Sequence, residues 1–82
     1  MPHVNIKYFG QEFTAEHKGR LAAAITEVVS DGFGVDRKAV SIALEPVAEP
    51  DWGEAVVDSE ITGRAHLLIQ EPGYLDDRQE HP

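Results

Sequence analysis

The residue best suited to chemistry is Pro2, which directly follows Met1 in this sequence of 82 residues. We expect Met1 to be removed, because the second residue is small, and the chain would then begin with a secondary amine. The α-amino group of a chain has a reference pKa of about 7.7–8.0, so burial or a nearby cation can hold it neutral at pH 7. A neutral, rigid amine can serve as a general base. If Met1 is retained, this nitrogen is an amide and cannot act as a base.

Two strands and a helix are predicted to position this amine. Apolar and polar side chains alternate over residues 2–9 and again over 39–46, which is typical of strands with one buried face. Between them, apolar residues at helical spacing predict a helix over 15–33, with Thr14 as N-cap and Gly34 as the residue that ends it. A strand, a helix and a strand form a right-handed βαβ crossover, so the two strands should be parallel.

The remainder of the chain is predicted to be smaller and less regular. Pro46 and Pro50 bracket a turn, Trp52 opens a short segment whose type the pattern leaves open, and a second, short helix is predicted over 59–70, ended by Pro72-Gly73. We therefore expect an α+β fold in one domain over 1–75, followed by a polar tail over 76–82.

Parallel strands also predict which side chains meet. Both strands start at the same end of the sheet, so Pro2 should lie beside Lys38 and Ser41. An amine, a cation and a hydroxyl would then share one rim. The alternative interpretation is that Pro2 merely starts an edge strand, that Lys38 is a solvated loop residue and that Ser41 is a small polar strand residue.

A sheet of two parallel strands is not a stable unit, because it leaves two open edges and faces that need cover. The small size of the domain adds to this, since a chain of this length buries only about 60–65% of its unfolded surface. The sequence therefore predicts self-association, as a dimer that joins two sheets into four strands.

The charge of the chain limits its partners. The formal net charge is −8, and residues 45–82 carry Arg64 and Arg78 as their only bases against ten acids. An acidic chain repels phosphate backbones and acidic membrane surfaces, so we expect neither nucleic acid nor a membrane as partner. An anionic substrate would find its cation mostly in the first half, at one of five positions: Lys7, Lys18, Arg20, Arg37 or Lys38.

Several other kinds of site lack support in the sequence. There is no cysteine, the four histidines match no metal template, and no serine lies in a nucleophile elbow. We therefore expect no metal and no cofactor. No apolar run approaches the ~18 residues of a membrane span, and we see no signal peptide. We expect a cytoplasmic protein.

An ordered set of features resembles a known family. Met1-Pro2-His3 opens the first strand, Thr14-Ala15-Glu16-His17-Lys18 leads into the long helix, and Trp52 follows the second strand after a turn. Further matches are Ile6-Lys7, Ser41-Ile42-Ala43-Leu44, Asp58-Ser59-Glu60-Ile61 and Pro72-Gly73-Tyr74. Through these features residues 1–74 resemble the 4-oxalocrotonate tautomerase family of the tautomerase superfamily, and in particular its small dimeric bacterial subgroup.

The resemblance implies a β-α-β fold, a dimer at least, and a cofactor-free reaction in which the N-terminal proline is the base. Pro2 takes that role, and Trp52 falls at the position of an aromatic residue that lines the pocket. The founding members use two arginines for the substrate, but the corresponding positions here are Phe13 and Ser41. A monocarboxylate such as phenylenolpyruvate is therefore favoured over a dicarboxylate.

The candidate substrate-binding residues are thus Lys38, Ser41, Trp52 and Phe13. Lys38 would replace the missing arginines, and Phe13 would be a pocket wall. Trp52 could instead be an ordinary core aromatic, and Phe13 a hydrophobic staple before the Thr14 cap.

The leading hypothesis is an isomerase that interconverts keto and enol forms of a small 2-keto or 2-hydroxy acid. One alternative keeps the scaffold but adds water or removes halide, for which Glu12 and Glu45 are candidate water activators. The other alternative is a non-catalytic dimeric interaction module, which retention of Met1 would favour.

Overall fold

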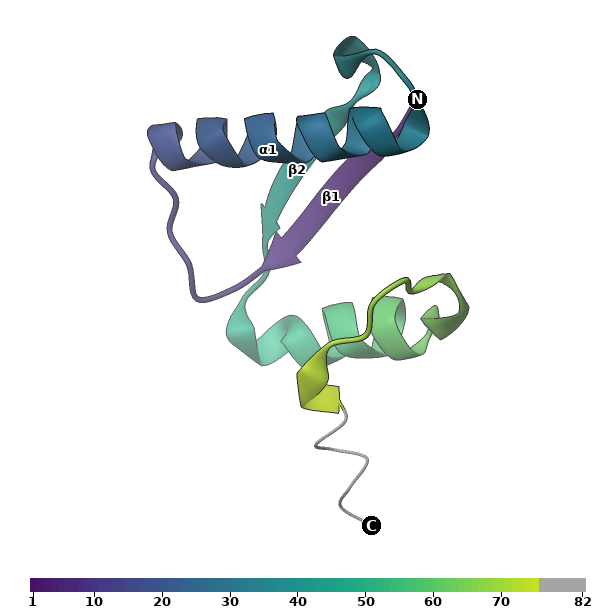
Figure 1. The fold of residues 1–82 in the computed structure, drawn as a ribbon. Coiled ribbons are helices and arrows are strands. Elements are labelled where there is room, and N and C mark those ends of the chain that lie inside the picture. Colours follow the sequence, from purple (N-terminus) through teal and green to yellow (C-terminus); the bar gives the residue numbers. More distant parts are fainter. Residues whose placement is uncertain (76–82) are drawn as a thin grey trace. The chain divides into compact units, whose positions relative to one another are not determined.

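The first compact unit of the structure, residues 1–49, is a β-α-β unit. β1 (His3–Tyr8) and β2 (Ser41–Pro46) pair in parallel, in a register that runs from His3 with Ser41 to Tyr8 with Pro46. α1 (Ala15–Phe33) connects them and lies across both strands (Figure 1). This computed structural model describes residues 1–75, and the predicted polar tail over 76–82 lies outside the described residues. The predicted fold class and the parallel pairing are confirmed.

Both ends of α1 are formed as the sequence predicts. The Thr14 Oγ1 accepts a hydrogen bond from the His17 backbone N–H at 3.0 Å, which satisfies one of the free donors of the first turn. Gly34 adopts a left-handed conformation with a φ of 65°, and the next residue, Val35, donates its N–H to the Ser30 carbonyl at 3.0 Å. Local caps therefore determine the length of the crossover helix.

The second strand begins two residues later than the pattern predicts. Arg37–Ala39 form a turn of 3₁₀-helix, and the Asp36 Oδ1 accepts the Lys38 backbone N–H at 2.8 Å. The capping carboxylate competes with strand geometry, as aspartate does in turns. The prediction that the strand starts at residue 39 is therefore wrong. The polar segment that precedes β2, next to Pro2, is a turn. β1 likewise begins at His3 and ends at Tyr8, one residue inside the predicted span at each end.

The two faces of the sheet differ in chemistry. Ile42 and Leu44 lie on the face toward α1 and are half-buried, and Val4 and Ile6 are their register partners in β1. The other face carries polar side chains, because successive residues of a strand point to opposite sides. Across that face the Asn5 Nδ2 donates to the Glu45 Oε1 at 3.0 Å.

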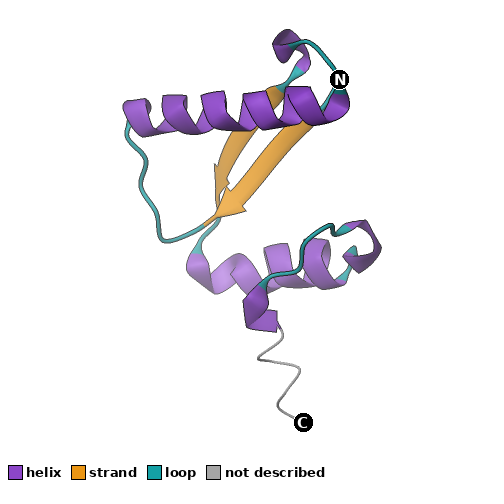
Figure 2. Ribbon diagram, in the orientation of Figure 1, coloured by secondary structure: helices purple, strands orange, loops and turns teal. Residues whose placement is uncertain are grey.

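In the second unit, which begins at Pro50, the helix lies elsewhere than predicted. A turn at Glu49–Asp51 leads into a π-helix over Gly53–Thr62, and a single 3₁₀ turn follows at Ala65–Leu67 (Figure 2). The prediction of a helix over 59–70 is therefore wrong in both bounds.

Buried valines and one glycine explain where this helix starts and stops. Val56 and Val57 are the buried apolar residues of the described chain, so the helix forms around them and not around the later apolar positions. Gly63 donates its N–H to the Asp58 carbonyl at 2.9 Å, and a Cβ on Gly63 would lie 2.5 Å from that oxygen. The position admits no side chain without a backbone shift, and the helix ends there.

Little of the described surface is removed from water in one chain. None of the described side chains is fully buried, whereas Val28 and Phe33 of α1 are 72% and 69% exposed. No helix within residues 1–75 is both long enough and apolar enough to cross a membrane.

Candidate active site

The start of β1 is held against the start of β2 by a backbone hydrogen bond. The Ser41 N–H donates to the Pro2 carbonyl at 3.2 Å, and Pro2 is half-buried. The proline nitrogen and this carbonyl belong to the same residue. The parallel register therefore brings the N-terminal end of the chain to the rim where β2 begins. The structure thus brings Pro2 and Ser41 together, as the parallel pairing implied.

Ser41 also contacts a residue that the sequence analysis did not select. The His3 Nδ1 and the Ser41 Oγ are 2.6 Å apart, which is a short hydrogen bond between side chains. The two residues are direct register partners. The spacing of the four histidines does not predict this pair. The signal in the sequence that could have indicated it is the position of His3 immediately after Pro2.

Lys38 lies in the turn that leads to the same rim. Its backbone is fixed by the Asp36 side chain, and the turn closes with the Val40 N–H bonded to the Arg37 carbonyl at 3.2 Å. Lys38 is exposed, so its ammonium group is accessible to an anion from solvent. The turn positions the backbone of this lysine three residues before Ser41.

Phe13 lies at the other end of β1. Its ring packs edge-to-face on Tyr8 with centroids 5.2 Å apart, and against the His17 ring at 4.9 Å. Six residue steps separate Pro2 from Tyr8, which corresponds to about 20 Å in a strand. Within one chain Phe13 is therefore distant from Pro2, and its contact in the first turn of α1 is with His17, one position before the residue that a hydrophobic staple uses.

Trp52 belongs to the second unit, and its place in a pocket around Pro2 stays a prediction. In that unit its indole Nε1 donates to the Tyr74 hydroxyl at 3.3 Å. The bond ties the residue that precedes the π-helix to the segment after Pro72. Tyr74, which is 44% exposed, is therefore one of the partners of this tryptophan.

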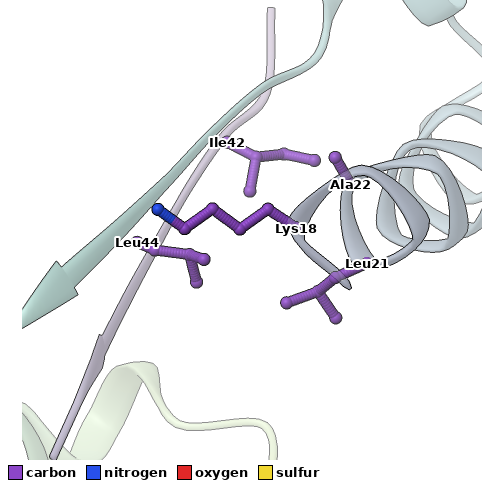
Figure 3. A pocket seen from close by; sticks show the side chains of 5 residues that line it. All are labelled: Lys18, Leu21, Ala22, Ile42 and Leu44. Atoms are coloured by element: carbon purple, nitrogen blue, oxygen red, sulfur yellow. The ribbon is translucent and has the colours of Figure 1, made fainter. Parts of the chain in front are cut away.

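A hollow of about 240 Å³ lies on the helix side of β2. It is lined by Lys18, Leu21 and Ala22 of α1 and by Ile42 and Leu44 of β2. Figure 3 shows the Lys18 stem reaching from α1 toward β2, with its nitrogen at the far end. Because Ser41 and Ile42 point to opposite faces, this hollow does not include the His3–Ser41 pair.

No group of three or more histidine, aspartate or glutamate side chains in residues 1–75 could hold a metal ion. The groups that the structure places at the rim of Pro2 are the imidazole of His3 and the hydroxyl of Ser41, and the turn that carries Lys38 leads into this rim.

Comparison with known proteins assigns the chain. The family model described as "Tautomerase enzyme" matches residues 2–59. The chain belongs to the tautomerase family. It is 51% identical over 74 residues to a protein of Klebsiella pneumoniae subsp. pneumoniae named Tautomerase PptA, which covers 90% of this chain and 97% of that relative. Proteins of the same name from Enterobacter sp. and from Escherichia coli O139:H28 are 43% and 38% identical over the same shares of both chains.

Membership confirms three of the expectations drawn from the sequence: the superfamily, the β-α-β fold and the class of enzyme, an isomerase of the tautomerase type. A tautomerase relocates a proton within one molecule, so its site needs a group that takes and returns the proton and donors that stabilise charge on the substrate oxygen. The groups at the start of the two strands are of these kinds.

Proposed function

We propose that this tautomerase interconverts the enol and keto forms of a small 2-keto acid such as phenylenolpyruvate, without a cofactor and in the cytoplasm. Pro2, freed by removal of Met1, is the base. The observation that carries the proposal is the hydrogen bond from the Ser41 N–H to the Pro2 carbonyl, because it holds the N-terminal residue at a rim with a hydroxyl and a lysine turn.

The proposed step is a proton shuttle. The Pro2 nitrogen takes the proton from the enol hydroxyl, the oxygen becomes a carbonyl, and the same proton is returned to the neighbouring carbon. One positioned group of this kind contributes about 10²–10⁴-fold to the rate. The negative charge that develops on the oxygen is stabilised by hydrogen-bond donors at the rim, for which backbone N–H groups are the candidates.

The shape of the proposed substrate follows from the same residues. One exposed lysine in the turn before β2 suits one carboxylate, which favours a monocarboxylate with an apolar body. Trp52 and Phe13 are the proposed apolar walls. Since Phe13 lies about 20 Å along β1 from Pro2, it can serve this pocket only from a second copy of the chain.

The proposed assembly is a homodimer. Within residues 1–75 each protomer leaves two sheet edges unpaired, and the pocket wall at Phe13 requires a second copy. Pairing of two such sheets into four strands would cover one edge of each and bring the end of one β1 toward the start of another.

Ultraviolet decay of phenylenolpyruvate tests the reaction directly. We expect protein that mass spectrometry shows to begin at Pro2 to accelerate ketonisation well above the buffer rate. The matched control is the same chain with an N-terminal extension, in which the Pro2 nitrogen is an amide, and its rate should fall close to that of buffer. A flat trace from the Pro2-starting protein would exclude this substrate and favour the hydratase or non-catalytic alternatives.

The role of Lys38 is separable from that of its neighbour. We expect Lys38→Gln to raise KM about tenfold with little change in kcat, because a charge-assisted hydrogen bond to a carboxylate is lost in ground state and transition state alike. Arg37→Gln is the control, since it removes an adjacent charge from the same turn and should change KM less than about twofold. Equal effects of the two substitutions would indicate general attraction of the anion and would refute a specific contact.

A further inference from the structure

The N-terminal segment is tied to β2 through one residue. The Ser41 backbone N–H binds the Pro2 carbonyl at 3.2 Å, and the Ser41 hydroxyl is 2.6 Å from the His3 Nδ1. A single position of β2 thus engages both of the first two residues that would remain after loss of Met1. The His3 ring and the Ser41 hydroxyl lie on the polar face, away from α1.

This contact is of little use for folding. Both side chains are exposed, and a hydrogen bond that competes with water adds little to stability. Its contribution is to hold the first residues of the chain in place. The first residues of a chain fray unless they are tied down, and a misplacement of about 1 Å in a reacting group can cost about 10²-fold in rate.

We propose that His3 and Ser41 form a positioning pair that holds the amine of Pro2 in line with the enol proton of the substrate. The inference rests on the proposed function of Pro2 and deepens it. The hydrogen bond from the Ser41 N–H to the Pro2 carbonyl sets the distance between the strands. The hydrogen bond between the Ser41 hydroxyl and the His3 ring prevents the start of β1 from rotating about that backbone bond. Ser41 lies at a position where the founding members of the family have an arginine for the substrate. In this protein Ser41 acts through the pair on the base and not on the substrate.

The sheet offers a matched control for this role. Asn5 and Glu45 form the next side-chain bond along the same polar face, at 3.0 Å. They are also exposed and also join β1 to β2, but they lie further from Pro2. If cross-strand bonds on this face act only on stability, the two pairs should behave alike in catalysis.

The test is a double-mutant cycle with phenylenolpyruvate as substrate, on proteins shown by mass to begin at Pro2. We expect Ser41→Ala and His3→Phe each to lower kcat about tenfold with KM within about threefold of the parent value, because the base is displaced while substrate contacts persist. The double variant should be no slower than either single one, since one shared bond is lost in all three. Asn5→Ala should retain the parent kcat.

A conservative substitution adds a second readout. The amide nitrogen of an asparagine reaches the place of the histidine Nδ1 but has no counterpart of Nε2. We therefore expect His3→Asn to restore most of the kcat that His3→Phe loses. If His3→Phe does not fold, Ser41→Ala and His3→Asn still test the positioning role of the pair.

The outcomes distinguish the positioning pair from the proposed function of Pro2 as base. Additive losses, a tenfold rise in KM for Ser41→Ala, or parent kcat in Ser41→Ala would overturn the positioning pair while leaving Pro2 as the base. Parent activity in Pro2→Ala or in the N-terminally extended chain would overturn the proposed function itself.

Discussion

Replacement of Pro2 by alanine is expected to lower kcat/KM for ketonisation of phenylenolpyruvate by about 10²-fold, with the fold retained. The loss lies at the lower end of the range for general acid–base catalysis, because the alanine variant also starts with an amine after removal of Met1. What it lacks is the ring that makes the amine secondary and restricts its backbone to a φ near −65°. The measurement is the initial rate of enol decay at several substrate concentrations.

The control for this experiment is structural. Pro2 accepts a hydrogen bond through its carbonyl, which alanine preserves, so the circular dichroism spectrum and unfolding midpoint of the variant should match those of the parent. A variant that unfolds with the parent's midpoint and turns over at the parent's rate would refute Pro2 as base.

The stability of the protein is expected to depend on its concentration. For a dimer that unfolds to separate chains, each tenfold increase in protein concentration should raise the apparent free energy of unfolding by about 1.4 kcal/mol. The physical reason is that one chain leaves its sheet edges open and keeps no described side chain fully buried. Urea titrations at about 1 and 100 µM protein test this expectation.

Light scattering at the same two concentrations provides an independent readout. A urea midpoint that does not move over this range, together with a scattering mass of one chain, would contradict the dimer and with it the contribution of Phe13 from a second copy. A midpoint that rises while the mass corresponds to more than two chains would retain self-association but correct the stoichiometry.

Much of the first unit could be predicted from the sequence because its signals are local. Alternation in residues 2–9, the Thr14 cap and the left-handed Gly34 each act within a few residues, and together they predict a strand, a helix and a second strand. The right-handed crossover then makes the strands parallel. The start of the candidate site at Pro2 was predictable for the same reason.

The turn before β2 and the second helix were not predictable in this way, because competing local signals had similar strength. Asp36 captures the Lys38 N–H and delays β2 to Ser41. After residue 50, apolar spacing suited a helix over 59–70, yet burial of Val56 and Val57 and the close approach at Gly63 place the helix over Gly53–Thr62. Packing overrides spacing where several short apolar patterns overlap.

The sequence by itself therefore determined the family scaffold, the parallel strands and the proline at the start of the first one. Only the tertiary structure decided that His3 binds Ser41 across 38 positions of sequence. This contact depends on strand register, which is set when distant segments pair and side chains alternate between the faces, and no local pattern encodes it.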